Sequence, residues 1–215
     1  MSAFYPVNLR LEGRKCLVIG GGTVAERKVK ALLAAGAQIT VLSPEITSLL
    51  SALVSVGSIA HIAAPYQTGR LGIFFIVICA TNNAAVNRLA AEEAGSKGAL
   101  VNVADAPELG DFIVPAHIVH GDLLITVSTG GKSPALARRL REELAARYGP
   151  EYGAYLEVLS RLRAELKEQL ATAEERNAFW REALSGEVLA LLAAGNMQEA
   201  EEKIRNAASR FRAKS

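Results

Sequence analysis

The sequence predicts an α/β protein that opens with a Rossmann-like, doubly wound parallel sheet. Over roughly the first hundred residues, short apolar runs rich in Val and Ile alternate with Ala-rich helical stretches, a pattern typical of strands covered by helices on both faces. The pattern then changes to a hairpin with one helix, and finally to helices alone. We therefore expect a Rossmann-like domain at 1–113, a small α/β segment at 114–150 and an all-α domain at 151–215.

The first domain should contain strands and helices in alternation, joined by right-handed crossovers. Each expected strand is a short apolar run, and each expected helix is a longer stretch with helical periodicity. We expect strands at residues 15–20, 38–43, 58–63, 73–80 and 99–103, and helices at 24–35, 45–56 and 84–97.

The middle segment should fold as a hairpin and one helix. Its strands are expected at 116–119 and 123–128, joined by a tight turn. Ser133 is a typical N-cap, and Pro134 suits the first position of the helix that follows. This helix should end near Tyr148, because a Gly-Pro pair comes next.

The last part is expected to be a small helical domain. Thr172 and Asn196 each precede a Glu by three residues, as in capping boxes that open helices. Gly186 and Gly195 are expected to end helices. Apolar side chains at three- and four-residue spacing should form one buried stripe on the first helix of this domain. The stripe consists of Tyr152, Tyr155, Leu159, Leu162, Leu166 and Leu170.

Composition and charge exclude several classes of function. A net charge of +2 and a pI of about 8.6 are too mild to indicate nucleic-acid binding. Cys16 and Cys79 lie in strand-like runs and are expected to be buried, reduced thiols, and no Cys/His spacing indicates a metal site. The N-terminus has no apolar signal core, and the longest apolar run, 71–80, is too short to cross a bilayer. A soluble, cytoplasmic protein is therefore expected.

A glycine-rich loop predicts a nucleotide site. The run from Gly20 to Ala25 satisfies G-x-G-x-x-G/A, directly after an expected strand and at the start of an expected helix. Gly20 would permit the tight turn, and Gly22 would let a pyrophosphate approach the backbone. The amides of Thr23 and Val24 at the helix start would hold the phosphates. The alternative is a tight strand–helix turn without a ligand.

The residues after the second strand favour NAD over NADP. Ser43 stands where a carboxylate normally pairs with the ribose hydroxyls, and Pro44 and Glu45 follow it. No Arg is present just after this strand to bind a 2′-phosphate, so ribose contacts are expected from Ser43, Glu45 or the backbone. Thr81 follows the fourth strand and should lie at the same carboxyl edge of the sheet.

Two further sets of residues could act on a substrate. Asp105 follows the fifth strand at the same edge and could serve as a general base, or it could simply cap its own turn. The second set surrounds the expected helix start and could form an anion site for a polycarboxylate, or an ordinary solvated charged face. It consists of Thr129, Gly130, Lys132, Ser133 and Arg138. His117 and His120 are interpreted as a strand residue and a turn residue without a shared function.

Four segments at these spacings resemble the siroheme synthase family. They are GGGTVAERK, CATNN, NVADAPELGDFIVPA and STGGKSPALAR. The resemblance is tight from residue 4 to about 148 and looser over the helical tail, and no methyltransferase domain of the larger synthases is expected within these residues. It implies an NAD-binding domain at 1–113 and a dimerisation segment at 114–150, with two subunits that swap these central segments in a homodimer. It also implies the oxidation of precorrin-2 to sirohydrochlorin with NAD. Some members also insert Fe²⁺ in the same cleft.

The resemblance also implies roles for particular residues. Asp105 falls on the family's catalytic Asp, and the residues at 23–24 and 44–45 fall on its NAD contacts. Thr129 stands where some relatives carry Ser, and Ala106 stands where many have a second Asp. The competing hypothesis is a non-catalytic NAD-sensing module on the same fold. Another small-molecule dehydrogenase is a third, but it would normally show a catalytic His, Lys or Tyr constellation.

Overall fold

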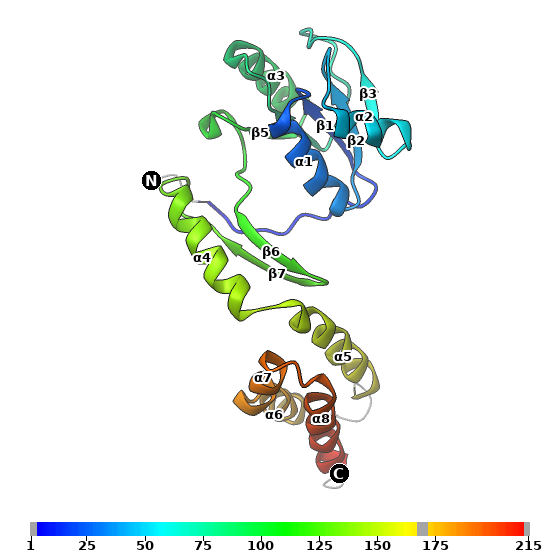
Figure 1. Cartoon of the computed structure of the whole chain (residues 1–215), viewed down its shortest axis with the longest axis vertical. Coiled ribbons are helices and arrows are strands. Elements are labelled where there is room, and N and C mark those ends of the chain that lie inside the picture. The colour runs from blue at the N-terminus through cyan, green and yellow to red at the C-terminus, as the bar shows by residue number, and fades with distance from the viewer. Residues whose placement is uncertain (1–3, 167–171, 213–215) are drawn as a thin grey trace. The chain divides into compact units, whose positions relative to one another are not determined.

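The computed structural model describes residues 4–166 and 172–212 (Figure 1). The chain divides into two compact units, Met1–Val114 and Pro115–Ser215. The first unit contains the parallel sheet with its helices, and the second contains the hairpin and the remaining helices.

The first unit is built on a five-stranded parallel sheet, as the sequence predicts. The strand order β3-β2-β1-β4-β5 places β1 at the centre, with two strands on each side. This is the order of a Rossmann-like doubly wound sheet, in which the carboxyl ends of β1 and β4 meet at the point where the winding reverses. The strands are β1 (Lys15–Ile19), β2 (Gln38–Leu42), β3 (Ala60–Ile62), β4 (Ile76–Cys79) and β5 (Leu100–Val103).

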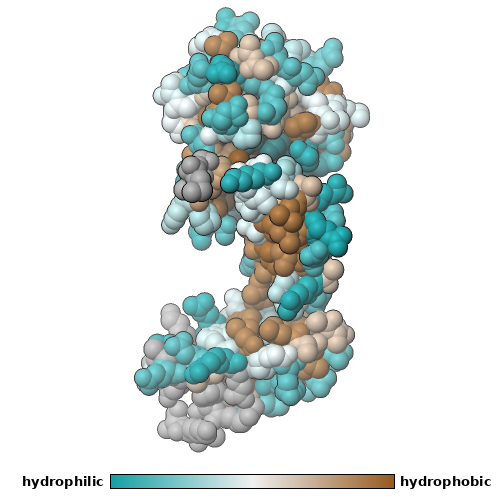
Figure 2. Space-filling view, turned by 90° about the vertical axis from the view of Figure 1, so that its left-hand side faces the viewer, coloured by the Kyte–Doolittle hydropathy of each residue, from teal (hydrophilic) through white to brown (hydrophobic). Residues whose placement is uncertain are grey.

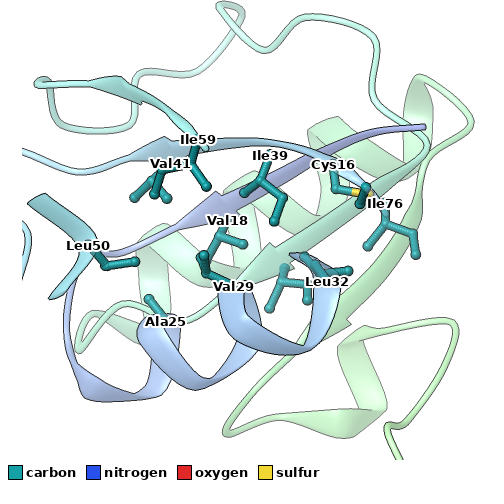
Figure 3. Close-up of a cluster of buried hydrophobic side chains, with 12 residues drawn as sticks. Cys16, Val18, Ala25, Val29, Leu32, Ile39, Val41, Leu50, Ile59 and Ile76 are labelled. Atoms are coloured by element: carbon teal, nitrogen blue, oxygen red, sulfur yellow. The ribbon is translucent and has the colours of Figure 1, made fainter. Parts of the chain in front are cut away.

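Helices cover both faces of the sheet. On one face, α1 (Thr23–Ala34) and α2 (Ser48–Ser55) pack on β1, β2 and β4 through a cluster that includes Val18, Val29 and Leu50 (Figure 3). On the other face, the Ala-rich side of α3 (Ala84–Ser96) packs on β4 and β5. The central strands are apolar on both faces because both are buried, which explains their continuous Val/Ile/Leu sequence.

Two boundaries differ from the prediction by three residues, and the other boundaries in this unit differ by at most two. The helix expected to begin at residue 45 begins at Ser48, because Thr47 is its N-cap and its Oγ1 accepts a hydrogen bond of 3.3 Å from the Leu50 amide. Residues 44–46 instead form a loop against the glycine turn. The strand expected to begin at residue 73 begins at Ile76, where ladder pairing with Cys16 starts.

The second unit opens with the expected antiparallel hairpin of β6 (Ala116–His120) and β7 (Leu123–Val127). Helix α4 (Pro134–Arg147) follows, with Ser133 as its N-cap. Both α4 and the next helix, α5 (Pro150–Leu166), contact the hairpin. Figure 2 shows hydrophobic surface gathered over this part of the chain. The exposed apolar side chains here include Val119, Leu124, Leu136 and Leu140.

The C-terminal helices pack around one apolar core. This core includes Tyr155, Leu162 and Phe179, with Leu159 packed against it. Of the expected stripe, the side chain of Leu166 and all of Leu170 lie outside the part that the structure describes. The helices are α5 (Pro150–Leu166), α6 (Ala173–Ala183), α7 (Gly186–Ala193) and α8 (Met197–Arg212).

In the second unit, the predicted helix starts and stops are confirmed in all but one case. Helices α6 and α8 begin directly after Thr172 and Asn196, and Gly195 follows α7 with a φ of +78°. The prediction for Gly186 was wrong: it is the first residue of α7, and Ser185 caps that helix by accepting from the Val188 amide. Within the described residues, no helix is long and apolar enough to cross a bilayer.

Candidate functional site

A cavity of about 540 Å³ lies at the carboxyl edge of the sheet. Three loops form it, and each directly follows one of the strands β1, β2 and β4. All eight of the residues proposed from the sequence for the cofactor lie in its lining. They are Gly20, Gly22, Thr23, Val24, Ser43, Pro44, Glu45 and Thr81. The rest of the lining consists of Gly21, Ile46, Thr47, Ala80 and Asn82.

The glycines of the first loop differ in what they face. Gly20 has a φ of +118°, and a Cβ there would lie 2.5 Å from the Ala80 carbonyl oxygen. A Cβ on Gly21 would collide with the Glu45 carbonyl oxygen. A Cβ on Gly22 would meet nothing within 4 Å. The first two glycines therefore allow the strand-end loops to pack closely, whereas Gly22 leaves space through which a ligand can reach the backbone.

The N-terminus of α1 is available to an anion. Its N-cap, Gly22, provides no side-chain oxygen, so the first amides of the helix have no side-chain acceptor. Glu26, in the first turn, is held by Thr47 Oγ1 and Lys30 Nζ, at 3.1 Å each. The hydrogen bonds from Lys30 and Thr47 lower the pKa of Glu26. The free amides and the helix dipole suit phosphate groups.

The loop after β2 is fixed against the glycine turn. Ser43 is buried, its carbonyl oxygen lies 2.9 Å from His61 Nε2, and its amide donates to Ile62. The Thr47 amide donates to the Gly21 carbonyl at 3.0 Å. Glu45 is exposed at the rim and is the one charged residue among those that line the cavity. The lining therefore offers a carboxylate, but no Lys or Arg, near the expected ribose.

A buried amide connects this cavity with Asp105. Asn87, on α3, has 1% of its surface exposed. Its Oδ1 accepts from the Thr81 amide (3.2 Å) and the Thr81 hydroxyl (2.7 Å), while its Nδ2 donates to the Thr81 carbonyl (3.0 Å) and to Asp105 Oδ1 (3.2 Å). Asp105 itself is exposed, just beyond the end of β5. Asn87 is not among the site residues predicted from the sequence.

The cysteine at the end of β4 is not positioned to react. Burial, together with the negative charge of Asp105, raises the pKa of Cys79 to about 12. Cys79 is fully buried, and burial also raises the pKa of Cys16. Both thiols therefore stay protonated at neutral pH, as the sequence predicts.

The residues proposed as an anion site lie together at the start of α4, in the second unit. Thr129 Oγ1 bridges to the backbone of Ser133, accepting from its amide and donating to its carbonyl at 3.1 Å each. Lys132 and Gly130 are exposed on the loop. Arg138 is exposed as well, and its Nε donates to Glu142 at 3.0 Å. The loop thus has a defined shape, but the Arg138 charge is already partly compensated.

The histidines offer no shared site. His117 pairs with Thr126 and His120 with Leu123 on opposite ends of the hairpin, and His117 Nδ1 lies 3.0 Å from the Pro115 carbonyl. Across residues 4–166 and 172–212, no group of three His, Cys, Asp or Glu side chains could hold a metal ion.

The fold and this cavity define a dinucleotide-binding domain of the Rossmann type. Residues 7–116 match a family model described as putative NAD(P)-binding. Residues 121–147 match the central region of sirohaem biosynthesis proteins, and residues 151–207 match the sirohaem synthase dimerisation region. With these three regions in this order, the chain belongs to the siroheme synthase family.

Relatives and a solved structure agree with this assignment. The siroheme synthase of Methylobacillus flagellatus is 39% identical over 181 residues, which cover 84% of this chain and 39% of that protein. The siroheme synthase of Escherichia coli O1:K1 is 37% identical, covering 91% and 43%. The chain thus spans about two fifths of the length of these relatives. The structure of SirC, a precorrin-2 dehydrogenase, matches with a TM-score of 0.77 and 28% identity, covering 94% of this chain and all of that one.

Proposed function

We propose that this protein oxidises precorrin-2 to sirohydrochlorin with NAD. The reaction transfers a hydride from the reduced tetrapyrrole to NAD⁺ and releases one proton, giving NADH. The observation that carries the proposal is the hydrogen-bonded connection, through one buried amide, between the nucleotide cavity and Asp105. The likeness to the precorrin-2 dehydrogenase along its whole length supports the same substrate.

The residues of the cavity fit the cofactor. Gly22 gives access to the amides at the start of α1, which suit the pyrophosphate. Glu45 at the rim suits ribose hydroxyls and disfavours a 2′-phosphate, which supports NAD rather than NADP. When bound there, NAD supplies the hydride acceptor.

Asp105 is proposed as the base. It is exposed at the carboxyl edge of the sheet, where ligands of such folds bind. Among the described side chains only Asn87 donates a hydrogen bond to Asp105, from its Nδ2 to the Oδ1 of Asp105. The other carboxylate oxygen can therefore accept the proton that the substrate loses, directly or through a water.

The second unit is proposed to serve dimerisation and substrate binding. The domain bounds 1–113, 114–150 and 151–215, expected from the sequence, are proposed with it. Support comes from the match of residues 151–207 to a dimerisation region and from the exposed apolar side chains over the hairpin and α4. The assignment of dimerisation to 114–150 alone stays a prediction. The loop formed by Thr129, Gly130, Lys132 and Ser133, with Arg138, is proposed to contact carboxylates of the tetrapyrrole. Insertion of Fe²⁺ and a cytoplasmic location stay predictions.

An anaerobic assay tests the proposal. The purified chain is mixed with precorrin-2 and NAD, and sirohydrochlorin and NADH are followed by absorption. We expect equal amounts of both products. Asp105→Ala should bind NAD normally but lose at least about 100-fold in turnover, whereas Glu108→Ala, an exposed acid in the same loop, should keep it. A chain that binds NAD without turnover would favour the sensing module, and an active Asp105→Ala would remove the role given to Asp105.

A further inference from the structure

The hydrogen bonds of Asn87 determine how its amide is oriented. Its Oδ1 faces two donors, the amide and the hydroxyl of Thr81, and its Nδ2 faces two acceptors, the carbonyl of Thr81 and Asp105 Oδ1. A flipped amide would place donor against donor and acceptor against acceptor. All four hydrogen-bonding positions of the side chain are therefore filled in one orientation only.

The location of Asn87 on its helix explains why it reaches both partners. Asn87 lies in the first turn of α3, where its backbone amide donates to the Asn83 carbonyl. Helical side chains lean towards the N-terminus of their helix. The side chain therefore points back to the loop between β4 and α3, which carries Thr81. Strand β5 lies next to β4, and its end brings Asp105 to the side-chain amide of Asn87.

The two partners belong to different parts of the proposed reaction. Thr81 lines the nucleotide cavity, whereas Asp105 lies beyond it as the proposed base. Asp105 is exposed and makes no other side-chain hydrogen bond among the residues described, so little else limits its rotamers. An exposed carboxylate without this hydrogen bond would sample several rotamers. A misplaced reacting group lowers the rate of the chemical step.

We propose that Asn87 is a positioning residue that holds the Asp105 carboxylate at a fixed place relative to the Thr81 side of the nucleotide cavity. This inference rests on the proposed function. It deepens that function by naming the group that sets the distance between the hydride acceptor and the base. Asn87 contacts neither substrate nor cofactor and acts only through Thr81 and Asp105.

Asn102 provides a matched control. It is the other buried asparagine of the first unit, with 4% of its surface exposed, and it lies on β5, close in sequence to Asp105. Its Nδ2 donates to the Phe112 carbonyl at 2.9 Å and its Oδ1 accepts from Lys28 at 3.2 Å. Removing either amide deletes buried hydrogen bonds, but only Asn87 bonds to Asp105.

The test compares Asn87→Ala with Asn102→Ala in the full chain. Thermal unfolding, the Kd for NAD, and kcat and KM for precorrin-2 are measured for each. Loss of a hydrogen bond to a charged group should lower kcat of Asn87→Ala by about 10- to 100-fold, with KM changed by less than about threefold. Asn102→Ala should lose comparable thermal stability and keep kcat within about threefold. Should Asn87→Ala not fold, Asn87→Ser, which is too short to span to Asp105, carries the same expectation.

Two outcomes would overturn the inference. One is a folded Asn87 variant with kcat within about threefold of the wild type. The other is an equal fall in kcat for Asn102→Ala, which would make both effects a matter of stability. A wild-type chain that binds NAD but never oxidises precorrin-2 would instead overturn the proposed function, and with it the Asp105 half of the inference. Whether Asn87 fixes Thr81 at the nucleotide cavity is then decided by the Kd for NAD. Asn87→Ala should raise this Kd, and Asn102→Ala should not.

Discussion

Replacing Gly22 with Asp should separate folding from cofactor binding. Gly22 is the N-cap of α1, with φ −84° and ψ −172°, an extended conformation that any residue adopts. A Cβ there meets nothing within 4 Å. Asp is among the preferred N-cap residues because its carboxylate accepts from the first free amides of the helix. The fold should therefore be unchanged or stabilised by a few tenths of a kcal/mol up to about 1 kcal/mol.

The same carboxylate should oppose NAD. It would occupy the amides that the pyrophosphate needs and add a negative charge beside it. At a separation of about 5 Å and an effective dielectric constant of about 20, two unit charges repel by about 3 kcal/mol. That energy corresponds to a loss of roughly 100-fold or more in affinity. The melting temperature should therefore stay the same or rise while the Kd for NAD rises. A variant that damages the fold would instead lower the melting temperature as it weakens binding.

Calorimetric titration with NAD and thermal unfolding measure both effects. Gly22→Asn is the matched control, since it has the same shape and capping ability without the charge. Its affinity should fall clearly less than that of Gly22→Asp, and the gap between the two should shrink as salt is added. If Gly22→Asp binds NAD within about threefold of the wild type, the phosphates do not lie at the start of α1.

Hydrogen bonds from Lys97 and the neighbouring loop outweigh burial and lower the pKa of Glu93 from 4.5 to about 2. Stability contributed by Glu93 should therefore be complete above about pH 4.5 and be lost as the pH falls towards 2; Glu93→Gln should flatten this part of the unfolding profile, and an unchanged profile would contradict the assignment. Cys16 and Cys79 should react with a thiol reagent at neutral pH only after denaturant is added, and native reactivity of either would contradict their burial. Ser133→Ala should cost about 1 kcal/mol in urea unfolding of the second unit, through loss of the cap on α4.

The elements of the sheet could be predicted because their signal is local. Val- and Ile-rich runs of strand length and Ala-rich helical stretches each indicate one kind of element. The start of α2 was misplaced by three residues for a reason that is not local. The Glu45 backbone packs against Gly21, and the Thr47 amide bonds to the Gly21 carbonyl, so this stretch is held outside the helix. Contacts between loops that are distant in sequence leave no periodic pattern.

Asn87 left a weak signal that could have been recognised. The buried face of α3 consists of Asn87, Ala90, Ala91 and Ala94, at helical spacing. Asn is the one polar residue on that face, and a buried amide must find partners. The identity of those partners depends on where β4 and β5 end relative to α3, which sequence spacing does not give. The sequence could therefore have shown that Asn87 is unusual, but not that it bonds to Asp105.

The absence of an acid at the end of β2 follows from the close packing of the loop after β2 against Gly21. Ser43 is buried, and its Oγ lies 2.8 Å from the place that a Cβ on Gly21 would occupy. A carboxylate at this position would be larger, would be desolvated beside the glycine turn, and would find no Lys or Arg among the residues that line the cavity. Glu45, two residues further on, is exposed at the rim of the same cavity. The close approach of this loop to Gly21 thus moves the acid from the strand end to the rim, where its charge stays hydrated and can still meet the ribose hydroxyls.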